Sequence, residues 1–372
     1  MRVVCSFVGG AGHLVPQLPL HRALVEAGHV LTLVGRASAV RAVPAGLYDG
    51  VVSAEDHRNE PSRTIAPLVP VDIEHELAVV EQHFAGSAAL TSAASVAPEL
   101  HTADLLVCDE LDFGAMAAAQ RAGVPVVVVA VIASGALVRP GRLAAPLDRL
   151  RDELGLAELI RLHGDLFVVP FAPPMRDPLF PAPADTVWMR PAIGAAPRPD
   201  GSIVATLGTE FNTESGDLFD RILSALGSVD APSVLAVGRD LDPARFSARR
   251  EHVRVEQFVD LDALAARASV VVHHGGSGLF LSSVLGGAPQ VVLPMGADQP
   301  FTARRVEGLG VGRALDAETA SADDIAGAVA SARADRALRT RTGALRLMTT
   351  RLPEPADVVD RIETALGSGR LR

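Results

Sequence analysis

Two glycine-rich segments, each carrying histidine, contain the residues best suited to chemistry. The first, Gly9–His13, reads GGAGH and follows the apolar run Val3–Val8. Glycines at a strand-to-helix turn let the backbone approach a ligand closely. An imidazole just before a helix is kept neutral by the positive end of the helix dipole, so His13 could act as a general base near pH 7. The competing interpretation is a structural histidine that hydrogen-bonds its own loop.

The same loop does not fit a dinucleotide site. In the pattern G-x-G-x-x-G, Gly10 and Gly12 supply the first two glycines, but Val15 stands at the third position. An NAD or FAD site is therefore disfavoured.

Asp109 is a candidate partner for His13. It follows the apolar run Leu105–Cys108, and the carboxyl ends of parallel strands form the crevices in which such folds bind ligands. A buried Asp109 that accepts the imidazole N–H would fix the tautomer and stabilise the imidazolium. The alternative is that Asp109, or more readily Glu110 or Asp112 beside it, caps the next helix.

The second segment is the strongest local signal in the chain. Val270–Leu285 reads VVVHHGGSGLFLSSVL, an apolar run that passes through two histidines and three glycines directly into a helix. Exposed N–H groups at a helix start bind anions, and the glycines let a phosphate approach them. We therefore predict a diphosphate cradle, with His273 as a donor that offsets charge on a leaving diphosphate.

Two further loops could complete this site. Asp298 and Gln299 follow an apolar run and offer carboxylate and amide groups that suit vicinal hydroxyls. Their competing role is to cap the helix that begins near Phe301. The loop Leu207–Thr209 ends another predicted strand and could face the same cleft.

A metal site is not favoured. The adjacent histidines suggest one, but no nearby cysteine or acidic residue completes a ligand set. The pairs at 240–242 and 260–262 read D-L-D and resemble metal-binding D-x-D motifs, although both precede helix-like segments and are predicted to be caps or turns.

These loops require parallel strands that end at one edge. Short β-branched runs alternate with helical stretches, which predicts doubly wound α/β sheets buried on both faces. The predicted strands are Val3–Val8, Val30–Val34, Leu105–Cys108, Val126–Val129 and Phe167–Val169 in a first series, and Ile203–Leu207, Val234–Val237, Val253–Glu256, Val270–His273 and Gln290–Leu293 in a second.

The break between the two series predicts two similar domains facing a cleft. The segment Pro191–Gly201, PAIGAAPRPDG, has three prolines and reads as a linker. We predict a first domain over 1–190, a linker over 191–200, a second domain over 201–352 and a final helix over 353–372 that packs back on the first domain. Residues 55–70 are predicted to form a long surface loop.

Composition excludes several classes of protein. The chain has 372 residues, enough for about two domains. All 34 basic residues are Arg, so there is no lysine for a Schiff base or an ordinary P-loop. A net charge of −10 argues against a nucleic-acid partner.

Cysteine usage and hydropathy predict a cytoplasmic protein. Cys5 and Cys108 lie in apolar runs and read as buried thiols in a reducing compartment. The N-terminus has no signal-peptide pattern, and the apolar stretch near Val124–Val138 is shorter than the ~20 residues of a membrane helix.

Together these motifs resemble the family 1 glycosyltransferases of GT-B fold, especially bacterial enzymes that decorate natural products such as antibiotics. The resemblance lies in residues 12–29, 271–278 and 286–312. It implies inverting, metal-independent transfer of a sugar, without a cofactor. The donor would be a nucleoside-diphosphate sugar, with a dTDP-linked deoxysugar favoured over a UDP-hexose. The acceptor would be a hydroxyl of a lipophilic small molecule, and a homodimer is compatible with the pattern.

The resemblance also implies a role for each motif residue. His13 would be the general base and Asp109 its partner. The diphosphate would contact His273, Thr209 and the backbone of the glycine loop, whose members are Gly275, Gly276, Ser277 and Gly278. Asp298 and Gln299 would contact the sugar. The nucleobase would contact the segment made of Gln257, Phe258 and Val259.

The chain departs from the family pattern at two positions. Leu279 replaces a hydroxyl residue that contacts phosphate, and Asp260 replaces a proline after the nucleobase segment. These departures motivate a second hypothesis, a non-catalytic nucleotide-sugar-binding auxiliary of a partner transferase, and a third is an epimerase of the same fold. Acceptor contacts are expected around residues 55–75 and 134–145.

Overall fold

The computed structural model describes residues 1–36, 43–54, 64–246 and 251–369. These residues divide into two compact units. Unit 1 comprises the described residues within Met1–His57, Glu74–Ala192 and Arg351–Arg372. Unit 2 comprises those within Arg58–Ile73 and Ile193–Thr350.

Unit 1 is built on a parallel sheet of seven strands in the order β3-β2-β1-β4-β5-β6-β7. Its central strands are buried on both faces, which explains why they read as continuous apolar runs. The strands are β1 (Arg2–Ser6), β2 (Val30–Arg36), β3 (Gly50–Ala54), β4 (Leu105–Asp109), β5 (Val126–Val129), β6 (Leu166–Val169) and β7 (Val187–Trp188).

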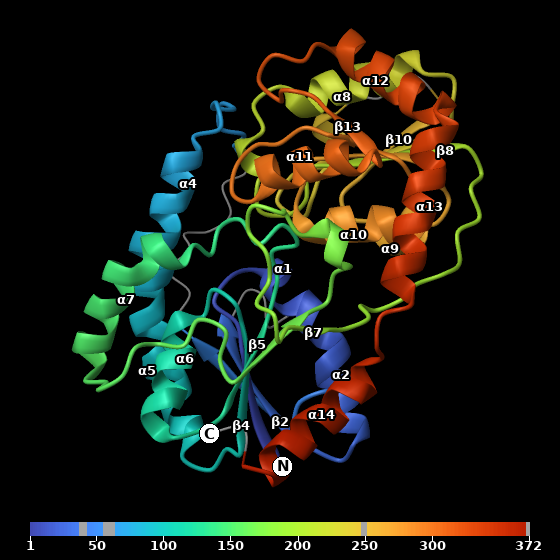
Figure 1. The fold of residues 1–372 in the computed structure, drawn as a ribbon. Coiled ribbons are helices and arrows are strands. Elements are labelled where there is room, and N and C mark those ends of the chain that lie inside the picture. The colour runs from blue at the N-terminus through green and yellow to red at the C-terminus, as the bar shows by residue number, and fades with distance from the viewer. Residues whose placement is uncertain (37–42, 55–63, 247–250, 370–372) are drawn as a thin grey trace. The chain divides into compact units, whose positions relative to one another are not determined.

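Helices cover both faces of this sheet (Figure 1). One face packs against α2 (Leu18–Glu26) and α14 (Pro355–Gly367), and Ile362 of α14 is fully buried in that core. The other face carries α5 (Ala88–Leu100) and α6 (Phe113–Ala122).

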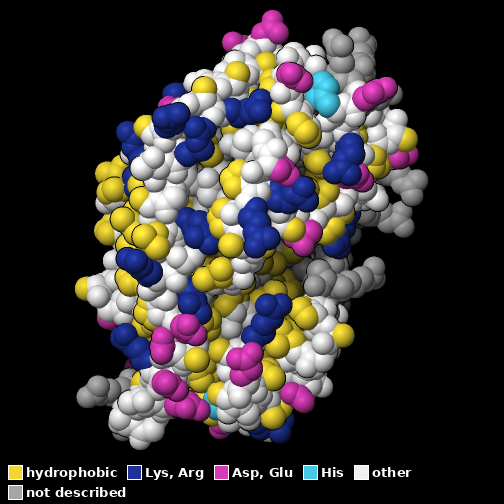
Figure 2. All heavy atoms as spheres, turned by 90° about the vertical axis from the view of Figure 1, so that its right-hand side faces the viewer, with side chains coloured by type: hydrophobic (Ala, Val, Ile, Leu, Met, Phe, Trp, Pro, Cys, Tyr) yellow, Lys and Arg dark blue, Asp and Glu magenta, His cyan; other side chains and the backbone are white. Residues whose placement is uncertain are grey.

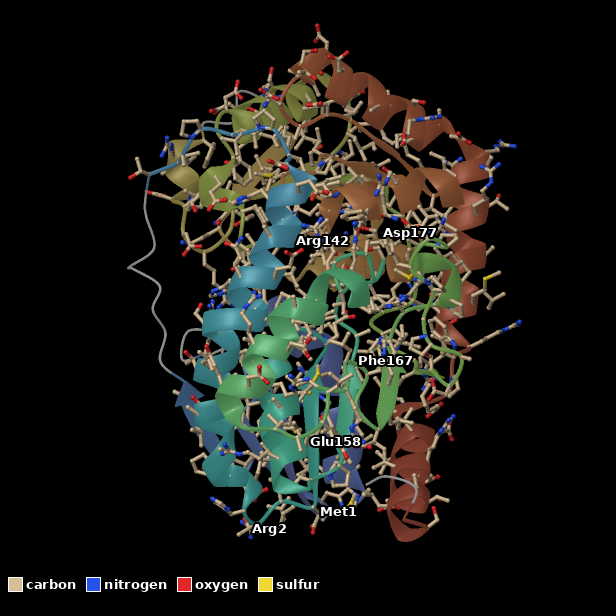
Figure 3. All side chains as sticks on the ribbon, turned by 60° about the vertical axis from the view of Figure 1, so that its left-hand side comes forward. Met1, Arg2, Arg142, Glu158, Phe167 and Asp177 are labelled. Atoms are coloured by element: carbon tan, nitrogen blue, oxygen red, sulfur yellow. The ribbon has the colours of Figure 1, made fainter. Side chains whose placement is uncertain are left out.

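Three shorter or outer helices complete the part of unit 1 that bears on function. They are α1 (Ala11–Leu14), α4 (Ile73–Val79) and α7 (Pro140–Leu154), and the π-helical segment η2 (Val80–Ser87) continues α4. Arg142 of α7, labelled in Figure 3, forms ion pairs with Glu74 at 2.6 Å and with Glu81, which ties α7 to α4 and η2.

Unit 2 is built on a parallel sheet of six strands in the order β10-β9-β8-β11-β12-β13. The strands are β8 (Ser202–Thr206), β9 (Ser233–Ala236), β10 (Val253–Glu256), β11 (Ala268–His273), β12 (Gln290–Val292) and β13 (Gly312–Ala314). Alternate residues of β11 face opposite sides, so Val270 and Val272 join one core cluster and Val271 joins another.

The helices of unit 2 lie on both faces of its sheet (Figure 1). On one face α8 (Leu218–Ser228) packs with α12 (Ala322–Ala334). On the other, α10 (Ser277–Gly286) packs with α9 (Leu261–Ala265) and α13 (Arg336–Thr350). The remaining helix, α11 (Gln299–Leu309), follows β12.

The doubly wound α/β architecture predicted from the sequence is confirmed, and every predicted strand is present. The strands that the pattern missed are β3, β7 and β13. Strand β7 has only two residues. Strand β13 has three, which read Gly-Arg-Ala, so neither β7 nor β13 contains an apolar run long enough to recognise.

The described part of the surface loop predicted over residues 55–70 has no helix or strand and is mostly exposed, as predicted. Residues 55–63 lie outside the described part of the chain. The described remainder, from Thr64, belongs to unit 2 rather than unit 1. There the Ala66 N–H donates to the Thr213 carbonyl at 2.7 Å, and Ile65 packs against the core of unit 2.

Three further features concern the cysteines, the hydropathy of the helices and the surface charge. Cys5 and Cys108 are buried free thiols. No helix among the described residues has the length and apolar character needed to cross a bilayer. On the face shown in Figure 2, Arg side chains are interspersed with Asp and Glu.

Candidate functional site

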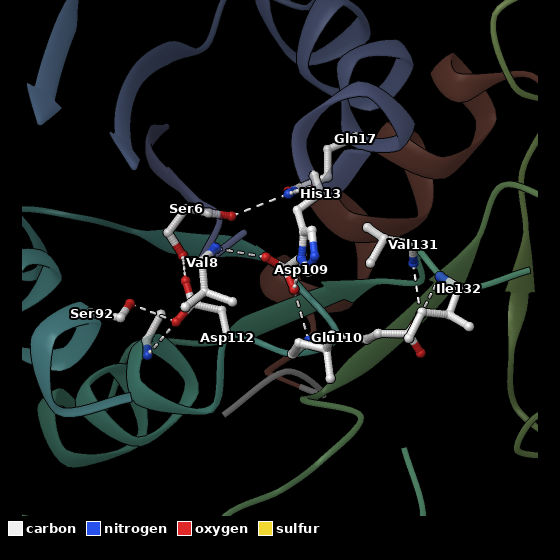
Figure 4. Close-up of polar contacts among 12 residues, drawn as sticks. Ser6, Val8, His13, Gln17, Ser92, Asp109, Glu110, Asp112, Val131 and Ile132 are labelled. Carbon is white, nitrogen blue, oxygen red and sulfur yellow. Dashed lines mark hydrogen bonds and ion pairs between the residues drawn. The ribbon is translucent and has the colours of Figure 1, made fainter. Parts of the chain in front are cut away.

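His13 and Asp109 come together at the carboxyl edge of the unit 1 sheet. Strands β1 and β4 are neighbours, with Ser6 in register with Cys108, so the segments that follow them leave the sheet side by side. The Nδ1 atom of His13 lies 3.2 Å from Oδ1 of Asp109, within ion-pair distance (Figure 4). The His13 side chain is 20% exposed and that of Asp109 is fully buried.

Backbone amides hold the Asp109 carboxylate in place. The Val8 N–H donates to Oδ2 at 2.9 Å, and the Leu111 N–H donates to Oδ1 at 2.8 Å. Hydrogen bonds to a carboxylate favour its charged form, which offsets the cost of burial. The two amides therefore fix the orientation of the Asp109 carboxylate against the imidazole.

The imidazole itself is packed between neighbours. Phe84 of η2 stacks on it with ring centroids 5.8 Å apart and planes 13° apart. A Cβ added at Gly9 would lie 2.1 Å from Cδ2 of His13, so any side chain there would displace the ring. The Gln17 amide donates to the His13 carbonyl at 2.9 Å and so ties the loop to the next helical turn.

The acidic residues beside Asp109 have different partners. Asp112 caps α6 by accepting the Ala115 N–H, as the capping interpretation predicts, and also accepts the hydroxyls of Ser6 and Ser92 at 2.7 and 2.5 Å. Burial, together with the charge of Asp109, raises the pKa of Asp112 to about 6.

Glu110 does not cap the next helix. Its carboxylate instead accepts the N–H groups of Val131 and Ile132, at 2.8 and 2.7 Å, in the segment that follows β5 (Figure 4). Burial raises the pKa of Glu110. This contact organises the loop after β5, within reach of the carboxyl edge of the sheet.

In unit 2 the glycine loop leads directly into α10. Gly276 precedes the helix and gives it no side-chain cap. The first N–H groups of a helix have no intrahelical acceptor, so the start of α10 offers donors to an anion. Gly275 has φ of +101°, a conformation that favours glycine.

His273 does not fit the role that the sequence predicts for it. Its side chain is fully buried, its Nδ1 accepts the Gly275 N–H at 3.0 Å, and its Nε2 lies 2.9 Å from Oε1 of Gln290. Burial lowers its pKa to about 4. Because both ring nitrogens are engaged inside the protein, His273 shapes the loop instead of presenting a donor to a diphosphate.

The neighbouring His274 lies against the loop to which the sequence analysis assigns the diphosphate. A Cβ at Gly208 would lie 2.6 Å from its Cε1, and a Cβ at Gly276 would lie 2.8 Å from its Nε2. The ring therefore lies between the Leu207–Thr209 loop and the start of α10. Burial lowers its pKa to about 3, which keeps it neutral. Sequence reasoning missed this residue, although successive side chains at a strand end alternate in direction.

Asp298 is brought next to the glycine loop. The Ser277 hydroxyl, at the first position of α10, donates to Oδ2 of Asp298 at 2.6 Å. Asp298 makes no side-chain cap on α11, so the capping alternative is wrong for it. Ala297 before it has φ of +50°, a strained value for a residue with a side chain.

Gln299 has a local role. Its Oε1 accepts the N–H groups of Met295 and Gly296 at 2.7 and 3.3 Å, and the side chain is almost fully buried. The carbonyl oxygen of this amide is thus used to close its own loop.

The predicted nucleobase segment follows β10. Phe258 is 58% exposed, and the Arg239 guanidinium lies over its ring, 4.4 Å from the centroid. The Gln257 amide donates to the Arg239 carbonyl at 2.9 Å. Val259 lines a shallow pocket of about 260 Å³ with Asp260, whose carboxylate caps α9.

One aspartate of each D-x-D pair caps a helix, in agreement with the prediction. Asp242 accepts the Ala244 N–H at 2.9 Å, and Asp260 accepts the Ala263 N–H at 3.0 Å. Among the described residues, no three His, Cys, Asp or Glu side chains gather in a way that could hold a metal ion.

The chain is similar in sequence to a domain of an erythromycin biosynthesis protein and to glycosyltransferases of Streptomyces species. Residues 220–365 match the model of the erythromycin biosynthesis protein CIII-like C-terminal domain. The chain is 35% identical to tylactone mycaminosyltransferase of Streptomyces fradiae over 41% of its own length and 34% of that protein. It is 29% identical to L-demethylnoviosyl transferase of Streptomyces niveus over 88% of its length and 87% of that protein.

The fold is shared with solved structures. The spinosyn rhamnosyltransferase SpnG complexed with thymidine diphosphate matches with a TM-score of 0.79 and 21% identity, over 98% of this chain and 100% of that one. The match to this chain spans about a third of the length of the mycaminosyltransferase and most of the length of the demethylnoviosyl transferase.

Proposed function

We propose that this chain is a natural-product glycosyltransferase of family 1 that glycosylates a lipophilic small molecule, and its GT-B fold and its similarity to glycosyltransferases support the proposal. The donor is a nucleoside-diphosphate sugar, with a dTDP-linked deoxysugar preferred. The acceptor group is a hydroxyl. The transfer inverts the anomeric centre and uses no metal ion or cofactor.

The observation that carries this proposal is the pairing of His13 with buried Asp109. The Nδ1 of His13 faces Asp109, so Nε2 is the ring nitrogen that takes the proton from the acceptor hydroxyl. The hydroxyl oxygen attacks the anomeric carbon while the bond from that carbon to the diphosphate oxygen breaks. Asp109 stabilises the imidazolium that forms.

The start of α10 and His274 support the proposed role of unit 2. Negative charge develops on the diphosphate as it leaves, and N–H groups at a helix start stabilise such charge without reorganising. A neutral imidazole can donate one N–H to a phosphate oxygen. Asp298, held by Ser277, is proposed to accept a sugar hydroxyl. Thr209 lies beside the same loop and is proposed to contact the diphosphate.

The preference for a thymidine nucleotide rests on the relatives. The SpnG structure is described as a complex with thymidine diphosphate. We propose that the nucleobase of the same donor class contacts Phe258 and the backbone of Gln257 and Val259.

The test is transfer by the purified chain alone. Incubation with dTDP- and UDP-sugars and a panel of polyketide and aromatic aglycones should release nucleoside diphosphate and yield a glycoside of the expected mass. NMR of the product should give the anomeric configuration opposite to that of the donor. Transfer only after addition of a second protein would instead support the auxiliary hypothesis.

A further inference from the structure

A short segment from the first half of the sequence forms part of unit 2. We call this segment, Thr64–Leu68, the strap. The Ala66 N–H donates to the Thr213 carbonyl at 2.7 Å, and the Ala66 carbonyl accepts the Gly216 N–H at 3.0 Å. Ala66 therefore holds the loop after β8 at two points. Both contacts are backbone hydrogen bonds, so they do not depend on the type of side chain at position 66.

Apolar packing reinforces these two bonds. Ile65 and Leu68 of the strap are half-buried against the main core of unit 2, and Phe211 of the loop packs against the same cluster. The backbones approach so closely that a Cβ at Gly216 would lie 2.8 Å from the Leu68 nitrogen. Gly216 also has φ of +53°, which favours glycine.

The loop that the strap holds leads to the diphosphate cradle. Phe211 contacts the His274 ring, with centroids 6.2 Å apart, and Gly208 lies against the same ring. On the other side, the buried Asn212 amide donates to the Val237 carbonyl at 3.2 Å. The loop thus depends on strap contacts at one end and on His274 at the other.

We infer that the strap is a positioning element of the donor site, in which Ala66 and Leu68 set the loop that carries Gly208, Thr209 and Phe211. The inference rests on the proposed function. The strap does not contact the nucleotide in this account. The strap restricts the conformations of residues 208–216, which include two glycines at positive φ. The loop then loses less conformational entropy when the nucleotide binds.

Variants in the strap should therefore change donor affinity, although the strap precedes the sheet of unit 2 by more than a hundred residues in the sequence. Leu68→Ala removes apolar contact with the core, and Ala66→Pro removes the N–H that bonds Thr213. Each should raise the Kd for thymidine diphosphate about tenfold. Leu68→Met keeps most of the packing and should restore the affinity.

The matched control is Val69→Ala. Val69 is the next residue, is 65% exposed and takes no part in the core cluster. Calorimetric titration of the full chain with thymidine diphosphate and uridine diphosphate measures the four variants, and thermal unfolding checks that each is folded. Wild-type affinity in Leu68→Ala, or an equal loss in Val69→Ala, would overturn the inference.

Hydrogen exchange provides a readout that does not require nucleotide. In Leu68→Ala the amides of residues 208–216 should exchange faster, while those of α12 should not. Unchanged exchange in 208–216 overturns the inference. Failure of the wild-type chain to bind either nucleotide would contradict the proposed function, and exchange alone would then decide the role of the strap.

Discussion

His13 is held by contacts that a single methyl group would disturb. Gly9 lies under the ring, Phe84 stacks on it and Asp109 faces Nδ1. A general base must keep its geometry to within a fraction of an ångström, so these neighbours matter as much as the base itself.

Replacing Gly9 with alanine tests this packing. The new Cβ would lie 2.1 Å from the imidazole carbon, so the ring must shift from the position in which it faces Asp109. We expect turnover to fall about a hundredfold, with nucleotide affinity unchanged. Gly12→Ala is the control, since a Cβ there meets no atom within 4 Å apart from its chain neighbours and the backbone of its own helix. Steady-state kinetics and nucleotide titration measure both variants, and equal rates would argue against a packed base.

The two adjacent histidines should respond differently to substitution. His274→Gln should raise the Kd for thymidine diphosphate about tenfold or more, because a hydrogen bond to a charged group is lost or misplaced. His273→Gln should mainly lower the midpoint of thermal unfolding, because His273 bonds Gln290 and Gly275. A larger loss of affinity in His273→Gln would restore the assignment made from the sequence.

Asp112 should make stability depend on pH. Its pKa in the folded chain is raised to about 6 from an ordinary value of 3.8, so the folded state favours its protonated form. The protonated Asp112 side chain therefore contributes to the stability of the fold. This contribution is complete below pH 3.8 and is lost as the pH rises through about 6. Relative to wild type, Asp112→Asn should become more stable between pH 4 and pH 6.5. Urea unfolding of both chains at each pH measures this difference, and a constant difference would contradict it.

At the level of elements, the site follows from where parallel strands end. The apolar runs of β1 and β4 were predictable, and with them the meeting of His13 and Asp109, because adjacent parallel strands end at one edge. The directions of the two histidines at the end of β11 were not predictable, because a shift of one residue in where the strand ends exchanges the faces to which they point. The strap was also beyond prediction, because its partners are more than a hundred residues away.

Helix α14 gives an element-scale prediction. Ile362 is fully buried against the sheet of unit 1, although α14 is far from that sheet in sequence. Ile362→Ala should lower the free energy of unfolding by about 3 kcal/mol, from lost burial and the cavity left behind. Thr364→Ala, on the exposed side of the same helix, should change it little. Denaturant unfolding distinguishes the two, and similar losses would mean that α14 does not anchor unit 1.

At the scale of the whole molecule, the proposed reaction binds a diphosphate without using lysine. All 34 basic residues are Arg, and those visible in Figure 2 are interspersed with acidic side chains. The proposed phosphate contacts use helix N–H groups, glycine backbone and a neutral imidazole, none of which is an ammonium. The absence of lysine is therefore compatible with the proposed reaction, and coding bias is its simplest cause.

The central claim is that His13 takes the acceptor proton, and His13→Ala tests it most directly. With a donor and acceptor that the wild-type chain uses, the variant should lose turnover by a factor of about 10² to 10⁴. Its affinity for thymidine diphosphate should stay within about twofold, because the proposed nucleotide contacts all lie in unit 2. A variant that keeps most of the wild-type transfer rate would contradict the account.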